Sequence, residues 1–117
     1  MKTVLIVEDT ELNVDLITQL LEDDYNLVIA NDGPQGVAMA IEKNPDLILM
    51  DITLPIMDGY EATRKIRETI KSTPIIGLSA HAMNEHAAKA KEAGCNDYLT
   101  KPINEEELFK MLEKYLG

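Results

Sequence analysis

Residues 47 to 59 read Leu47-Ile48-Leu49-Met50-Asp51-Ile52-Thr53-Leu54-Pro55-Ile56-Met57-Asp58-Gly59. Four bulky apolar residues lead directly into an aspartate, and a proline-containing turn follows at once. A short apolar run bounded by turn residues is typical of a strand that is buried on both faces of a parallel sheet. The stretch therefore predicts a buried strand that presents the carboxylate of Asp51 at its end.

Apolar runs and helical patterns alternate along the whole chain. Strands are predicted at residues 3–7, 26–30, 46–50, 75–78 and 97–99. Helices are predicted at about 10–22, 34–43, 58–70 and 84–93, with a last helix capped by Asn104. Five such units predict an α/β fold of the flavodoxin-like (βα)5 type, a doubly wound parallel sheet with strand order 2-1-3-4-5. Residues 1–117 are expected to form one domain.

Two helices carry side-chain patterns that the structure can test. The basic residues of the third helix, Arg64, Lys65 and Arg67, are expected on a solvated face. One face of the first helix is expected to be buried, and it contains Leu12, Leu16, Ile17, Leu20 and Leu21.

Composition narrows the classes of function. The chain has 117 residues with a formal net charge of −10, so its surface repels nucleic-acid phosphates and anionic lipids. No apolar run reaches the roughly 18 residues of a membrane span. The N-terminus does not resemble a signal peptide, and the single Cys95 excludes an internal disulfide. We expect a cytoplasmic protein that binds neither nucleic acid nor membranes.

Polar groups follow four of the predicted strands. The first strand is followed by Glu8 and Asp9, the third by Asp51, the fourth by Ser79 and the fifth by Lys101. In doubly wound sheets, ligands bind beyond the carboxyl ends of the strands, near the switch in strand order. We therefore expect these five side chains to lie at one rim.

Carboxylates packed at one rim need a cation, and a site built from hard oxygen ligands suits Mg²⁺. Asp9 and Asp51 are the expected direct ligands, Glu8 is expected to hold a metal-bound water, and the backbone carbonyl of Thr53 is placed for a further ligand. Taken alone, Asp9 is better explained as a helix N-cap and Lys101 as a solvated lysine. Only their joint occurrence at one rim favours a site.

Such a site suits phosphoryl chemistry. A carboxylate beside Mg²⁺ and an ammonium group can attack phosphorus and form an acyl phosphate. Asp51 is the expected nucleophile, Lys101 neutralises charge on the phosphoryl oxygens, and the Ser79 hydroxyl hydrogen-bonds one of them afterwards.

Four motifs resemble the receiver domain of two-component response regulators, the CheY-like family. They are Val7-Glu8-Asp9, residues 49–59, the pair Ser79-Ala80, and Tyr98-Leu99-Thr100-Lys101-Pro102. The motifs occur in the family's order and on the expected strands, so the resemblance covers essentially the whole chain. Residues 79–83 and 93–98 look most like receivers of hybrid sensor kinases and DivK-like single-domain regulators.

The resemblance implies a mechanism. Asp51 would accept phosphate from a phosphohistidine on a sensor kinase or phosphotransfer protein, in a reaction that needs Mg²⁺. Ser79 and Tyr98 would form the switch pair, although Tyr98 can also be read as an edge-strand aromatic residue. The signal would leave through the face made by the fourth helix, fifth strand and fifth helix, toward a downstream effector. The Lys101-Pro102 bond is expected to be cis.

Other details of the resemblance bear on regulation. No output domain is expected after Gly117, so the domain would act by binding partners or relaying phosphate, unless it was cut from a longer hybrid protein. Thr53 and His81 would flank the phosphoryl group and tune its lifetime. Gly77 is unusual within a central strand, where it relieves crowding or adds mobility.

Two rival functions are weighed against this one. A metal-dependent phosphatase that uses an aspartyl-phosphate would carry a second Asp two residues after its nucleophile, where this chain has Thr53. A degenerate receiver that is not phosphorylated and serves only as a protein-binding module would lack Asp51 or Lys101, and both are present.

Overall fold

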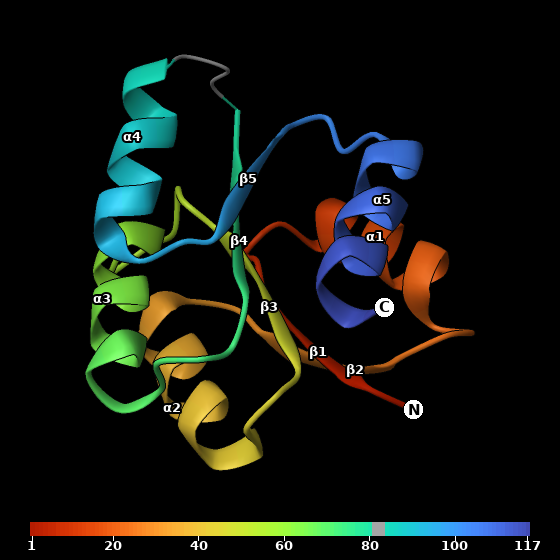
Figure 1. Cartoon of the computed structure of the whole chain (residues 1–117), viewed down its shortest axis with the longest axis horizontal. Coiled ribbons are helices and arrows are strands. Elements are labelled where there is room, and N and C mark those ends of the chain that lie inside the picture. The colour runs from red at the N-terminus through yellow and green to blue at the C-terminus, as the bar shows by residue number, and fades with distance from the viewer. Residues whose placement is uncertain (81–83) are drawn as a thin grey trace.

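A parallel sheet of five strands lies at the centre of the computed structural model, which describes residues 1–80 and 84–117 (Figure 1). The strand order is β2-β1-β3-β4-β5, and every neighbouring pair is parallel. The predicted flavodoxin-like fold and strand order are confirmed. The strands are β1 (Thr3–Val7), β2 (Asn26–Ala30), β3 (Leu47–Asp51), β4 (Ile75–Ser79) and β5 (Asp97–Thr100).

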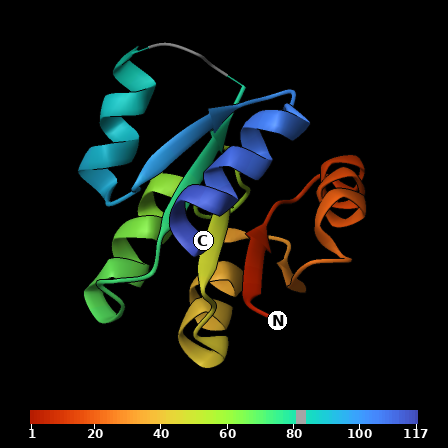
Figure 2. The same cartoon turned by 45° about the vertical axis from the view of Figure 1, so that its right-hand side comes forward.

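Helices cover both faces of the sheet. They are α1 (Glu11–Leu21), α2 (Gly33–Lys43), α3 (Gly59–Thr69), α4 (Asn84–Ala93) and α5 (Glu105–Leu116). Helices α1 and α5 lie on one face and α2, α3 and α4 on the other (Figure 1; Figure 2). Asp32, Asp58 and Asn104 cap α2, α3 and α5, each accepting a hydrogen bond from the N–H three residues on. Within the described residues, no helix is both long and apolar enough to cross a membrane.

The apolar run that precedes Asp51 is buried on both faces of the sheet. All five residues of β3 are buried. Ile48 and Met50 pack in the core beneath α2, α3 and α4, whereas Leu47 and Leu49 pack against α1 and α5. A central parallel strand has no solvent face, so its sequence is continuously apolar and does not alternate.

Three strands continue one residue further than the sequence predicted. β3 ends at Asp51, β4 at Ser79 and β5 at Thr100, and the ladder pairs Ser79 with Thr100. The polar groups of the rim are therefore held by the last hydrogen bonds of the sheet. Gly59 fixes the next helix closely against this end, because a Cβ there would overlap the backbone carbonyl of Asp51.

The buried face of α1 differs from the prediction. Ile17 and Leu21 are buried, but Leu12 is 76% exposed and Leu16 is 39% exposed. At about 100° per residue, positions 12 and 21 lie on opposite sides of a helix, so one buried face cannot include both. The inclusion of Leu12 and Leu16 in the core was wrong.

The solvated role predicted for Arg67 was also wrong. Its guanidinium donates hydrogen bonds to the carbonyl of Gly94 at 3.0 Å, to that of Ile70 at 3.3 Å and to Asn96 Oδ1 at 2.7 Å. Arg67 thus joins the end of α3 to the loop between α4 and β5. Gly94 has a φ of +117°, and a Cβ there would lie 2.8 Å from Arg67 Cγ, so this loop requires glycine.

The corrected face of α1 predicts unequal effects of two leucine truncations. Leu21→Ala should lower the free energy of unfolding by about 2–5 kcal/mol, because it opens a cavity in the core. Leu12→Ala should change it by less than about 0.5 kcal/mol, because that side chain is exposed. Urea unfolding of both variants measures the difference, and equal losses would contradict the orientation of α1.

Candidate functional site

Three carboxylates meet at the carboxyl edge of the sheet, as the sequence predicted. Glu8 and Asp9 follow β1, and Asp51 ends the neighbouring strand β3. Each offers an oxygen, and these oxygens lie within 4.8 Å of one another. Glu8 is fully buried and Asp51 is 2% exposed, whereas Asp9 is exposed. The strand order alone brings these residues together, because β1 and β3 are adjacent at the switch in the sheet.

Backbone amides orient the two buried carboxylates. The Thr10 N–H donates to Glu8 Oε2 at 3.0 Å, and the Thr53 N–H donates to Asp51 Oδ1 at 3.1 Å. The N-cap of α1 is Thr10, so the alternative explanation of Asp9 as a helix cap is wrong. Asp9 is left facing solvent at the rim.

Lys101 follows the edge strand β5, and its ammonium group contacts the two buried carboxylates. Its Nζ lies 2.7 Å from Glu8 Oε1 and 3.3 Å from Asp51 Oδ1, and its side chain is only 18% exposed. The Lys101 N–H donates to the Ser79 carbonyl at 2.6 Å, which anchors the chain just after β5. Lys101 is therefore an internal counter-ion, and the alternative of a solvated surface lysine is wrong. The Lys101-Pro102 bond is cis, as predicted.

The pKa values of the two buried acids are shifted in opposite directions. Burial and the neighbouring Glu8 carboxylate together raise the pKa of Asp51 to about 7, although Lys101 opposes the shift. Burial also acts to raise the pKa of Glu8, but hydrogen bonds from Lys101 and the Thr10 N–H outweigh it and lower that pKa overall. Burial acts to lower the pKa of Lys101, and its contacts with Glu8 and Asp51 outweigh this and raise it. Near neutral pH, Glu8 is thus ionised, Lys101 is positively charged, and Asp51 is partly protonated.

The other predicted site residues lie at or near the same edge. Ser79 is buried at the end of β4, and Thr53 is exposed just past Asp51. Tyr98 is half-buried in β5 and packs on the core beneath α2, α3 and α4. His81 lies outside the described residues.

A model of the response regulator receiver domain matches residues 4–113. The chain belongs to this family. This receiver domain is therefore a signalling domain of two-component systems and not an enzyme in the ordinary sense. Receiver domains of the family bind Mg²⁺ at their acidic site and interact with histidine kinases or phosphotransfer proteins.

Relatives and solved structures agree with this assignment. The polar-differentiation response regulator DivK of Brucella ovis is 37% identical, over 99% of this chain and 97% of its own length. The receiver domain of the sensor histidine kinase PA1611 from Pseudomonas aeruginosa, solved with magnesium in its active-site cleft, is 39% identical with a TM-score of 0.92, over 99% and 98% of the two chains. The Ssk1 receiver, solved with the phosphotransfer protein Ypd1 of Saccharomyces cerevisiae, is 31% identical with a TM-score of 0.92, over 97% and 88%.

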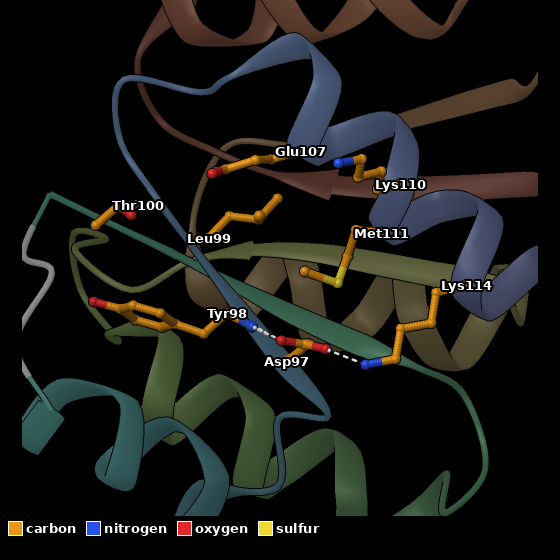
Figure 3. A pocket seen from close by; sticks show the side chains of 8 residues that line it. All are labelled: Asp97, Tyr98, Leu99, Thr100, Glu107, Lys110, Met111 and Lys114. Carbon is orange, nitrogen blue, oxygen red and sulfur yellow. Dashed lines mark hydrogen bonds and ion pairs between the residues drawn. The ribbon is translucent and has the colours of Figure 1, made fainter.

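A separate cavity of about 480 Å³ lies between β5 and α5 (Figure 3), and Glu8, Asp9 and Asp51 are not among its lining residues. Lys114 Nζ and the Tyr115 hydroxyl both donate to Asp97 Oδ2 at 3.0 Å, which ties the end of α5 to the start of β5. The sequence alone does not indicate these contacts, since the residues are distant along the chain. The cavity is lined by Asp97, Tyr98, Leu99, Thr100, Glu107, Lys110, Met111 and Lys114.

The raised pKa of Asp51 predicts that this residue destabilises the metal-free protein at alkaline pH. Because the folded-state pKa is about 7 and the ordinary value 3.8, the folded form holds a proton that the unfolded form loses. The stabilisation from that proton is complete below pH 4 and is lost as the pH rises through 7. In EDTA at pH 8, Asp51→Asn should be more stable than wild type by on the order of 2–4 kcal/mol, and at pH 4 the two should be equal.

Urea unfolding across this pH range tests the prediction. Asp58→Asn is the matched control, because Asp58 is an exposed helix cap and asparagine caps helices equally well. A stability difference between Asp51→Asn and wild type that does not grow with pH would contradict the electrostatic account.

Proposed function

We propose that residues 1–117 form a receiver domain in which Asp51 accepts a phosphoryl group from a phosphohistidine of a sensor kinase or phosphotransfer protein. The reaction depends on Mg²⁺. The observation that carries the proposal is the position of Asp51, a nearly buried carboxylate at the end of a central strand with Lys101 Nζ 3.3 Å away. An ammonium beside a carboxylate nucleophile is the arrangement that phosphoryl transfer needs.

The donor set fits Mg²⁺. Three carboxylates with close oxygens are hard ligands, and two are buried beside a single lysine, so the site has a surplus of negative charge. In our assignment Asp9 and Asp51 bind the ion directly, Glu8 holds one of its waters, and the Thr53 backbone carbonyl contributes a further ligand. When bound, the ion neutralises charge on the phosphoryl oxygens. The magnesium in the PA1611 receiver supports this assignment.

The residues of this chain account for the transfer step. An oxygen of Asp51 attacks the phosphorus, the new O–P bond forms as the N–P bond of the phosphohistidine breaks, and the imidazole nitrogen retains the electron pair. Lys101 stabilises the charge on the phosphoryl oxygens, and the Ser79 hydroxyl donates to one of them in the product. Hydrolysis of the acyl phosphate ends the signal.

The same proposal extends to output. Ser79 and Tyr98 act as the switch pair and change the face formed by α4, β5 and α5, where a downstream effector binds, or the phosphate is relayed onward. The cavity between β5 and α5 supports a docking role for this face, because it is formed by two of the three elements that make up the face. The net charge of −10 favours protein partners over nucleic acid or membranes. We place this interaction in the cytoplasm.

The first test is phosphoryl acceptance measured by intact mass. After incubation with acetyl phosphate and Mg²⁺, wild type should gain one phosphoryl group, which hydroxylamine removes. Asp51→Asn should gain none, and the matched carboxylate control Asp58→Asn should behave as wild type. No gain in wild type with acetyl phosphate and with a phosphorylated phosphotransfer protein would overturn the proposal and favour a binding module that is not phosphorylated.

The titration of Asp51 predicts pH-dependent binding of Mg²⁺. A carboxylate must lose its proton to coordinate the ion, and the pKa of Asp51 is about 7. The apparent Kd for Mg²⁺ should therefore rise about tenfold between pH 8 and pH 6 and level off above pH 8. Isothermal titration calorimetry measures it, and a Kd that is constant from pH 6 to 8 would contradict the assignment of Asp51 as a ligand.

A further inference from the structure

Gly77 is the one glycine in the strands that the structure describes, and it occupies the middle of β4. Its backbone does not need glycine, because its φ is not positive. A glycine inside a strand costs stability, since it has no side chain to pack and loses more conformational freedom on folding. The reason for glycine here must therefore lie in the space beside it.

The space beside Gly77 lies on the same face of the sheet as the two proposed switch residues, Ser79 and Tyr98. The ladder pairs Gly77 with Tyr98, and residues in register on parallel strands project to the same face. Ser79 is two residues further along β4, so it projects to this face too. Figure 3 shows the Tyr98 ring on the opposite side of β5 from Leu99 and Met111. Gly77 thus lies beside Tyr98 and on the same face of the sheet as Ser79.

The dimensions show how much room the missing side chain leaves. A Cβ at position 77 would lie 3.3 Å from Ile52 Cδ1, 3.6 Å from Cys95 Sγ and 3.7 Å from Tyr98 Cδ2. A methyl group would therefore touch all three neighbours with a small shift of Ile52. A β-branched side chain adds two atoms to Cβ, and these must be placed among the same neighbours. Ile52 and Cys95 are each 6% exposed, whereas Tyr98 is half-buried and therefore has a side that solvent reaches.

We propose that Gly77 is a positioning residue that leaves room for the Tyr98 ring to lie against β4, and so sets the balance between inward and outward positions of the ring. The inference rests on the proposed function, because it concerns the switch that follows phosphorylation of Asp51. A side chain at position 77 interacts with only one of the two ring positions, so it shifts their populations without touching the phosphoryl site. Gly77 would therefore set how strongly phosphorylation is coupled to the effector face.

The position of the ring can be measured without any phosphodonor. The chain has four tyrosines, so 3-fluorotyrosine labelling should give four ¹⁹F resonances, with that of Tyr98 assigned through Tyr98→Phe. In Gly77→Val, the broadening of the Tyr98 resonance by a soluble gadolinium chelate should increase about twofold or more, as the ring moves outward. Gly77→Ala should leave the Tyr98 resonance unchanged, because its Cβ would lie 3.7 Å from Tyr98 Cδ2, an ordinary contact distance. The Tyr115 resonance is the internal reference.

Gly36→Ala is the matched control for the loss of a packed glycine. A Cβ at position 36 would lie 2.8 Å from Val7 Cγ1, in the same core but beside β1, which is three strands away from β5. This variant should lose stability and leave the Tyr98 resonance unchanged. If Gly77→Val does not fold, Gly77→Ser carries the test, because it adds a single small atom beyond Cβ.

Phosphorylation gives the second readout. In wild type, acetyl phosphate with Mg²⁺ should move the Tyr98 resonance, and in Gly77→Val the shift should be lost although intact mass shows the same phosphoryl gain. A Tyr98 resonance as protected in Gly77→Val, or in Gly77→Ser where the valine variant does not fold, as in wild type would overturn the inference, as would an undiminished shift on phosphorylation. Failure of wild type to gain the phosphoryl group would instead overturn the proposed function, which the mass measurement reveals separately.

Discussion

Two carboxylates buried side by side are the constraint on which the site depends. Glu8 and Asp51 are almost wholly removed from water, and their negative charges would repel each other. The ammonium group of Lys101, which contacts both carboxylates, partly offsets this repulsion. Removing ions from water costs several kcal/mol each, so such a pair persists only with a counter-ion in good geometry. The site is built to hold negative charge that the protein itself only partly neutralises.

The fold meets this constraint through its strand order. Glu8 follows β1, Asp51 ends β3 and Lys101 follows β5, so the three charges come from parts of the chain that meet only in the sheet. The final ladder hydrogen bonds fix Asp51 and Ser79 to the sheet, and the close approach of Gly59 holds the following helix against the same edge. Rigid strands thus carry the reacting groups, while the exposed Asp9 and Thr53 border the opening. The incomplete neutralisation explains why Asp51 holds its proton up to about pH 7 and why a divalent cation suits the site.

Much of this arrangement could be predicted from the sequence, because it follows from patterns of short range. The apolar run before Asp51, the capping residues Asp32, Asp58 and Asn104, and the alternation of elements predicted the fold, and the rule for strand ends then placed the carboxylates together. The features that the sequence did not show depend on the orientation of a helix against the sheet and on how far a long side chain extends. Helix geometry excludes a single face that holds both Leu12 and Leu21, but only packing against the sheet decided that Leu12 is the one that faces solvent. The hydrogen bonds of Arg67 to the loop before β5 depend on how far a flexible side chain extends, which a sequence pattern does not contain.

The central claim, that Asp51 and no other group receives the phosphoryl group, is tested most directly by locating the modification. Borohydride reduction of the phosphorylated protein converts an acyl phosphate of aspartate to homoserine, and tandem mass spectrometry of the peptides that contain residues 8–9 and residues 47–64 then identifies the site. We expect homoserine at position 51 and unmodified aspartate at position 58. Reduction at Glu8, Asp9 or Asp58, or a phosphorylated protein with no reducible acyl phosphate, would contradict it.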